Sequence, residues 1–169
     1  MSTEQTTKTP RVVIITGISG AGRRTAAHAV EDLGWYVVDN LPPAMLGALV
    51  DEIAANNIDR LAVVLDVRSR IMFDALGVAV NALDERGIDP AIVFLEASDE
   101  TIVRRQESSR RPLPLQQGGH LLDAVALERR MLSDLRAEAD LVIDTTSITA
   151  RQLAQRIDHA LSLIHISEP

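Results

Sequence analysis

The 169-residue sequence contains no cysteine. This absence excludes a disulfide framework and a cysteine-based metal site, and it favours a reducing compartment, so we expect a cytoplasmic protein. No apolar run approaches the roughly 20 residues that span a bilayer. Residues 1–10 lack the apolar core of a signal peptide. Neither membrane insertion nor export is therefore predicted.

Aromatic residues and net positive charge are also lacking. The aromatic fraction is 2%, and the formal net charge is −7. Few side chains remain for stacking on bases, and duplex binding rests mainly on Lys and Arg contacts to phosphates. We therefore do not expect this segment to bind RNA. The 46% of apolar residues is enough for the core of one globular domain.

Short β-branched and apolar segments alternate with segments of helical periodicity. The expected strands are 11–16, 35–39, 60–67, 91–97 and 141–144. The expected helices are 22–33, one opened by Pro42 and Pro43, 71–85, 99–108, one resuming near Asp123, and 149–163 with Thr149 as its cap. This alternation predicts an α/β fold, with a parallel sheet of about five strands and helices on both faces.

Three regions flank or interrupt this pattern. We expect a flexible arm at residues 1–10, a nucleotide-binding domain at 11–161 and an irregular tail at 162–169, which is a candidate truncation point. The segment 108–120 is rich in Arg, Pro, Gln and Gly, so it is predicted to cross the surface and to act as a mobile lid.

A glycine-rich segment lies between the first strand and the first helix. It consists of Gly17, Ile18, Ser19, Gly20, Ala21, Gly22, Arg23, Arg24 and Thr25. The glycine spacing and the strand-to-helix context are typical of a P-loop, in which main-chain amides and a helix start surround phosphates. The sequence therefore predicts a P-loop NTPase-like fold that binds ATP or GTP with Mg²⁺.

The loop departs from the usual pattern after its last glycine. Arg23 and Arg24 stand where Lys and Ser or Thr are usual, and Thr25 comes one residue late. Arginine keeps the charge but is bulkier and planar, which favours phosphate binding over accurate placement of a transferring group. We predict Arg23 as a phosphate ligand and Thr25 as a candidate metal ligand. Arg24 either joins the site or faces solvent.

Two acidic residues end predicted strands beside the loop. Asp39 and Asp66 are candidate catalytic residues, because ligands of open α/β sheets gather at the carboxyl ends of strands. Either carboxylate can accept a proton, and Asp66 can also hold magnesium. The alternative, left open, is that each caps a loop or the next helix, which is the role expected of Asp144. Likewise, Arg104, Arg105, Arg110 and Arg111 either close over phosphates or form a solvated face.

Four motifs occur together in a specific order. They are GISGAG at 17–22, DNLPP at 39–43, DVRS at 66–69 and RRPL at 110–113. With them the chain resembles the amino-terminal domain of the RapZ/YvcJ nucleotide-binding family over residues 11–157. The resemblance implies that the loop from Gly17 to Arg24 binds ATP. It also implies slow hydrolysis and a GTP-binding segment made of Asp66, Val67, Arg68 and Ser69.

The resemblance also bears on partners. Known members present a small regulatory RNA to an RNase, and that activity is tied to a carboxyl-terminal domain. RNA and an RNase are therefore expected as partners only through such a domain, which we expect to lie outside this chain. A homo-oligomer is expected as well. The lid departs from the Arg-Arg-His-Pro-Leu pattern of the family, since no histidine follows Arg111.

Three functions remain open from the sequence. The first is a regulatory nucleotide-binding domain, with or without slow hydrolysis. The second is a small-molecule kinase that transfers the γ-phosphate of ATP to a metabolite hydroxyl. The third is a binding module whose nucleotide only sets its conformation or assembly.

Overall fold

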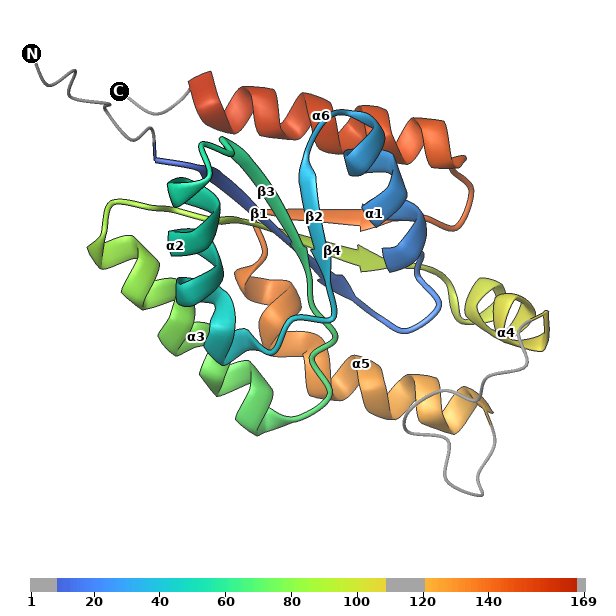
Figure 1. Ribbon diagram of the computed structural model, residues 1–169. Helices are drawn as coiled ribbons and strands as arrows, with labels where there is room; N and C mark the ends of the chain where they lie inside the picture. The colour runs from blue at the N-terminus through green and yellow to red at the C-terminus, as the bar shows by residue number, and fades with distance from the viewer. Residues whose placement is uncertain (1–8, 109–120, 167–169) are drawn as a thin grey trace, which may run out of the picture.

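A computed structural model describes residues 9–108 and 121–166. Five strands form one sheet in the order β2-β3-β1-β4-β5, and every neighbouring pair is parallel. The strands are β1 (Arg11–Gly17), β2 (Tyr36–Asp39), β3 (Arg60–Val64), β4 (Ala91–Glu96) and β5 (Leu141–Asp144). The predicted parallel sheet is confirmed, with β1 at its centre (Figure 1).

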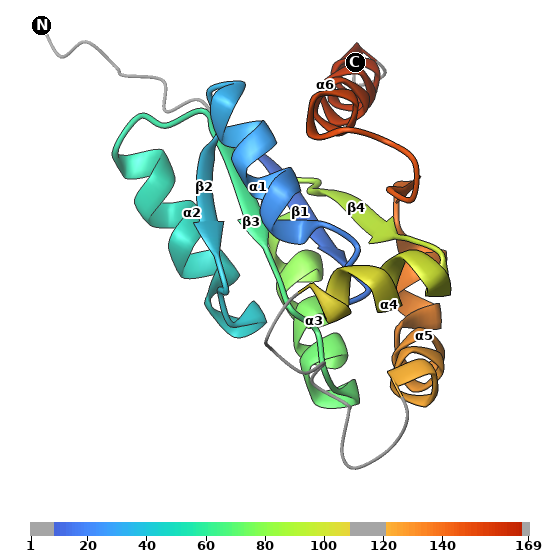
Figure 2. The same cartoon turned by 90° about the vertical axis from the view of Figure 1, so that its right-hand side faces the viewer.

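Helices cover both faces of the sheet, as predicted. They are α1 (Arg23–Asp32), the short 3-10 helix η1 (Pro43–Met45), α2 (Leu46–Ala55), α3 (Arg70–Glu85), α4 (Asp99–Glu107), α5 (Leu121–Glu138) and α6 (Ala150–Ile166). Helices α1 and α6 lie against one face and α3 and α5 against the other (Figure 2). Parallel strands need such covering helices because both faces of the sheet are apolar.

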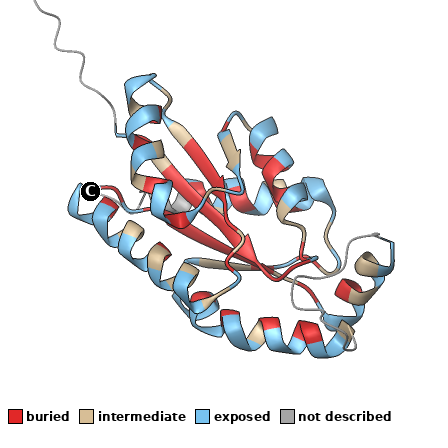
Figure 3. Ribbon diagram, turned by 60° about the horizontal axis from the view of Figure 1, so that its bottom comes forward, coloured by how far each residue is buried: buried red, intermediate tan, exposed pale blue. Residues whose placement is uncertain are grey.

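The core consists mainly of the three central strands. In β1, Val13, Ile14 and Ile15 are fully buried, and the neighbouring strands β3 and β4 are buried over most of their length. The edge strands β2 and β5 are only partly covered. Figure 3 shows this contrast between the buried central strands and the exposed outer faces of the helices. The apolar, β-branched run 11–16 predicted a buried strand, and the burial of β1 agrees with this prediction.

Two boundaries differ by three residues from the sequence-based expectation. Strand β3 ends at Val64 rather than at residue 67, because its pairing with Ile15 of β1 and with Asp39, the last residue of β2, ends there. Helix α6 continues to Ile166, so residues 162–166 are helical rather than irregular. No proline or glycine occurs between residues 150 and 166 to end that helix.

Several predicted features lie outside the described residues. They are positions 1–8 of the arm, positions 109–120 of the lid with Arg110 and Arg111, and positions 167–169 of the tail. Among the helices of residues 9–108 and 121–166, none has the length and apolar character needed to cross a membrane.

Candidate functional site

The glycine-rich loop connects β1 to α1 at the carboxyl end of the central strand (Figure 1). Gly17, Gly20 and Gly22 have φ angles of +150°, +84° and +102°, a region that side chains disfavour. A Cβ atom on Gly17 would lie 2.2 Å from the carbonyl oxygen of Leu95 on β4. Glycine is therefore required at position 17 by the close approach of two strands, and at positions 20 and 22 by backbone conformation.

The loop and the first turn of α1 present unused main-chain donors. Gly22 is the N-cap of α1 and provides no side-chain hydrogen bond, and the first bond of the helix runs from Ala26 N–H to Gly22 O (2.9 Å). In the described part of the chain, no hydrogen bond uses the N–H groups of Gly20, Gly22, Arg23, Arg24 or Thr25. Free amides at a helix start favour an anion, because the helix dipole adds partial positive charge there.

Other groups of the loop are held by the surrounding protein. The N–H of Ile18 donates to β4 and that of Ala21 donates to Ile18 O, each at 3.0 Å. The main-chain N–H and the hydroxyl of Ser19 both donate to Oε1 of Glu128, at 2.7 and 2.8 Å. The hydroxyl of Thr145 donates to the carbonyl of Ala21 at 2.6 Å. These bonds fix the loop from β4, from α5 and from the segment after β5.

Arg23 is the first residue of α1 and stands at the position of the usual P-loop lysine. Its side chain belongs to an ion-pair cluster with Asp66 and Arg68, which follow β3. Its Nη1 is 2.8 Å from Oδ1 of Asp66, and both side chains are mostly buried, at 19% and 15% exposed. The same nitrogen also lies 3.4 Å from Leu65 O. Arg68 binds the other carboxylate oxygen of Asp66, with Nε at 2.5 Å from Oδ2. Asp66 therefore connects the loop to the segment that follows β3.

The cluster sets the charge state of Asp66. Burial raises the pKa of its carboxyl group, but the hydrogen bonds and positive charges of Arg68 and Arg23 outweigh this effect, and the net pKa lies below the ordinary 3.8. The carboxylate in turn raises the pKa of Arg68. Asp66 is therefore a stable anion at neutral pH and a weaker base than an unpaired carboxylate.

The lowered pKa of Asp66 gives a pH-dependent stability. A carboxyl group with a depressed folded-state pKa stabilises the fold above its unfolded pKa, and the stabilisation is lost as pH falls through the folded value. We expect the unfolding free energy of wild type minus that of Asp66→Asn to be constant near neutral pH. It should shrink below about pH 3.8. Urea titrations across this pH range measure the difference in unfolding free energy, with Asp39→Asn as control. A difference that does not vary with pH would contradict the lowered pKa of Asp66 in the ion-pair cluster.

The remaining predicted residues are spread around the loop. Arg24 and Thr25 are exposed, and Asp39 is exposed at the end of β2, where its side chain has no interaction in the described part of the chain. Val67 is buried, and Ser69 caps α3 by accepting from the N–H of Met72 at 3.2 Å. Asp144 accepts from the N–H and hydroxyl of Thr146, as expected of a cap.

No described interaction joins the two predicted magnesium ligands. Thr25 lines a cavity, and Asp66 binds Arg23. Within residues 9–108 and 121–166, no group of three or more His, Asp or Glu side chains is arranged to hold a metal ion.

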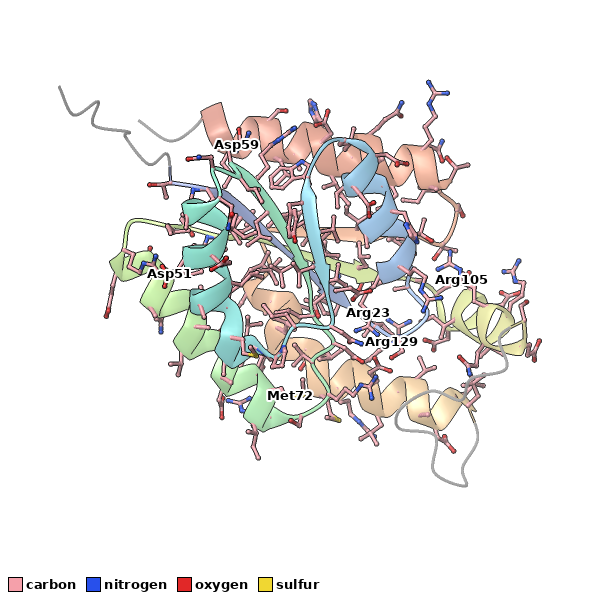
Figure 4. All side chains as sticks on the ribbon, in the orientation of Figure 1. Arg23, Asp51, Asp59, Met72, Arg105 and Arg129 are labelled. Carbon is pink, nitrogen blue, oxygen red and sulfur yellow. The ribbon has the colours of Figure 1, made fainter. Side chains whose placement is uncertain are left out.

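The cavity beside Thr25 has a volume of about 270 Å³. It is lined by Ala21, Gly22, Thr25, Arg105, Thr145, Ile148, Thr149, Ala150 and Leu153. Arg105 of α4 donates to Gly20 O (2.9 Å), Thr145 Oγ1 (3.2 Å) and Thr145 O (2.9 Å). Figure 4 shows Arg23 and Arg105 at the carboxyl edge of the sheet, far from Asp51 and Asp59. One of the predicted lid arginines therefore contacts the loop, whereas Arg104 is exposed.

Two contributors to this site were not singled out from the sequence. Glu128 and Thr145 are both buried, at 7% and 3% exposed, and both bind the loop. The sequence could have indicated Glu128, because it is the one acidic residue among the buried positions of α5. These positions are Ala124, Val125, Glu128, Leu132 and Leu135. Thr145 had none, since a threonine after a strand is common in turns.

The model of the RapZ-like N-terminal domain matches residues 11–163. This chain belongs to the RapZ-like N-terminal domain family. The match includes the loop, the Asp66 cluster and the cavity beside Arg105, and it confirms the resemblance inferred from the motifs.

Curated relatives of this RapZ-like domain are named nucleotide-binding proteins. One from Cutibacterium acnes (strain DSM 16379 / KPA171202) is 99% identical over 162 residues, which are 96% of this chain and 56% of the relative. One from Streptomyces coelicolor (strain ATCC BAA-471 / A3(2) / M145) is 53% identical over 151 residues, covering 88% of this chain and 50% of the relative. The chain thus spans about half the length of the curated relatives it matches.

Solved structures show which fold the RapZ-like domain has. A shikimate kinase from Acinetobacter baumannii, in complex with shikimate, superposes with a TM-score of 0.64 at 19% identity, covering 95% of this chain and 97% of that one. The tunicamycin resistance protein of Deinococcus radiodurans gives a TM-score of 0.62 at 19% identity, over 90% and 95%. The predicted P-loop NTPase-like α/β fold is confirmed.

Proposed function

We propose that this domain binds ATP or GTP with Mg²⁺ through the loop 17–25. The observation that carries the proposal is a set of N–H groups at the start of α1, those of Gly20, Gly22 and residues 23–25, which have no partner in the part of the chain that the structure describes. Phosphate oxygens supply the acceptors that these donors lack, and the guanidinium of Arg23 adds a full positive charge beside them. The relatives' common name, nucleotide-binding protein, supports the same assignment.

The nucleoside is assigned to the cavity beside Thr25. This cavity begins at Gly22, where the phosphates would end, and its walls combine the apolar Ile148 and Leu153 with the hydroxyls of Thr145 and Thr149. Apolar walls with a few polar groups are typical of small-molecule sites. Arg105 is held by Gly20 and Thr145, so it can cover a base that enters the cavity.

The Arg23–Asp66 pair favours nucleotide binding over rapid turnover. A phosphate that binds Arg23 must compete with a carboxylate already 2.8 Å away. Asp66, as a weak base, is suited to hold Arg23 and to contact a magnesium ion through water rather than to take a proton. We propose slow or absent hydrolysis, with the nucleotide acting as a regulator. By the family resemblance, the regulated protein is an RNase adaptor.

Calorimetric titration tests the proposed binding. Adding ATP or GTP with magnesium to the purified domain should give a saturable signal that inorganic triphosphate suppresses. The absence of heat and of chemical-shift changes at millimolar nucleotide would overturn the proposal. Unchanged signals after addition of triphosphate would show that nucleotide binds elsewhere than at the loop.

Asp66→Asn separates the two roles of Asp66. The substitution removes the anion that competes for Arg23, so ATP affinity without magnesium should rise several-fold. The gain in affinity on adding magnesium should fall, because a carboxylate near the ion is lost. Titrations with and without magnesium measure both effects. Equal weakening in both conditions would instead show that Asp66 only holds Arg23 in place.

Asp39 favours a small-molecule kinase as a second candidate. Its carboxylate is exposed at the carboxyl end of β2, one strand beyond the Arg23 cluster, and it has no partner among the described residues. An unpaired carboxylate near a phosphate site is suited to accept the proton of an attacking hydroxyl. ATP consumption that rises many-fold with one member of a metabolite panel, and falls in Asp39→Asn, would support this function. A flat response would remove it.

A further inference from the structure

Glu128 is a buried carboxylate that packing does not explain. It lies on the inner face of α5, where the other buried residues are Ala124, Val125, Leu132 and Leu135, and it is 7% exposed. Transfer of a charged group into an apolar layer costs free energy unless the group is hydrogen-bonded. A leucine or methionine would fill the same place at lower cost, so the carboxylate must serve another purpose.

Both described contacts of Glu128 go to one residue of the phosphate loop. Oε1 accepts from the main-chain N–H of Ser19 at 2.7 Å and from its hydroxyl at 2.8 Å, across 109 positions of sequence. Hydrogen bonds to a charged acceptor are shorter and stronger than those between neutral groups. Oε2 is buried and has no hydrogen-bond partner in the described structure. The pKa of Arg68 is raised first by its bond to Asp66 and also by the charge of Glu128.

The Ser19 contacts determine which amides of the loop stay free. The N–H of Ile18 is used by β4, that of Ala21 by the carbonyl of Ile18, and that of Ser19 by Glu128. The amides of Gly20 and Gly22 have no hydrogen-bond partner among residues 9–108 and 121–166. Because both its donors bind one carboxylate oxygen, Ser19 is held in place, and the loop keeps the conformation that leaves the remaining amides available to an anion.

We propose that Glu128 is a positioning residue of the phosphate loop, which acts through Ser19 and does not touch the nucleotide. This inference rests on the proposed function. It makes α5, which follows the segment 109–120 directly, a structural support of the phosphate site. Removal of the carboxylate would leave two donors of Ser19 without an acceptor in a buried place, and the loop would sample other conformations.

Matched variants and two probes test this role. Glu128→Ala should weaken binding of magnesium ATP and of inorganic triphosphate by the same factor, at least about fivefold. Glu128→Gln keeps an acceptor for Ser19 and should restore affinity to within about threefold of wild type. Glu138→Ala, an exposed glutamate at the end of the same helix, is the control and should not change affinity. In the Glu128→Ala background, Ser19→Ala should cause no further loss.

The outcomes separate the inference from the function on which it rests. If wild type binds neither ATP nor triphosphate, both fail. If wild type binds and Glu128→Ala binds as tightly, the positioning role alone is overturned. Where the alanine variant does not fold, amide exchange in the wild-type protein decides the question instead. Loss of thermal stability without loss of affinity would show a structural role and would overturn it too.

Amide exchange in the wild-type protein gives an independent readout. In the free protein the Ser19 amide should exchange at least tenfold more slowly than those of Gly20 and Gly22, because only Ser19 is bonded. Addition of magnesium ATP should slow the two glycine amides and leave Ser19 unchanged. A Ser19 amide that exchanges as fast as its glycine neighbours would overturn the proposal without any substitution.

Discussion

Gly17→Ala is expected to destabilise the fold by about 3 kcal/mol or more, as overpacked and strained sites do. The new methyl carbon would lie 2.2 Å from the carbonyl oxygen of Leu95 and 2.8 Å from its nitrogen, with φ at +150°. These atoms belong to the backbone of β4, which pairs with β1 throughout this region, so no side chain can move aside. Urea unfolding monitored by circular dichroism measures the loss.

Gly77→Ala is the matched control for this prediction. Gly77 lies within α3, and a Cβ atom there would meet nothing within 4 Å. The substitution should stabilise the protein by about 0.5–1 kcal/mol, because alanine loses less backbone entropy in a helix. If both variants change stability by similar amounts, the close approach of β1 and β4 at Gly17 is not as tight as the structure has it.

Arg23→Ala is expected to lower the affinity for magnesium ATP by about 1.5 to 3 kcal/mol, the range for hydrogen bonds to charged groups. This corresponds to roughly a ten- to hundred-and-fifty-fold increase in Kd. Arg23 opens α1 next to the unused amides of the loop, and its guanidinium already binds an anion, the carboxylate of Asp66. Isothermal titration gives the Kd, and thermal melting confirms that the variant is folded.

The neighbouring arginine supplies the control for this second prediction. Arg24 carries the same charge one position along α1, but it is exposed and has no described contact. Arg24→Ala keeps the main-chain N–H, so its affinity for ATP should stay within about threefold of wild type. Equal losses in the two variants would show that affinity follows net charge rather than a defined contact of Arg23.

Local sequence was sufficient to predict the architecture of this domain. Buried strands, helix starts and the glycine loop are short-range patterns, since β-branched runs, apolar periodicity and glycine spacing each constrain a few consecutive residues. For the same reason, the sequence predicted that the loop connects a strand to a helix, and that Asp39 and Asp66 follow strands on the same edge of the sheet.

The contacts that shape the site were decided only by the tertiary structure. The pairing of Arg23 with Asp66, the bond from Ser19 to Glu128 and the contact of Arg105 with Gly20 join residues 43, 109 and 85 positions apart. The end of β3 at Val64 likewise depended on its register with β1. Such partners are selected by strand order and helix packing, which no local pattern of residues encodes. The sequence by itself therefore determined the secondary-structure elements and their order, and only the tertiary structure determined which side chains contact one another.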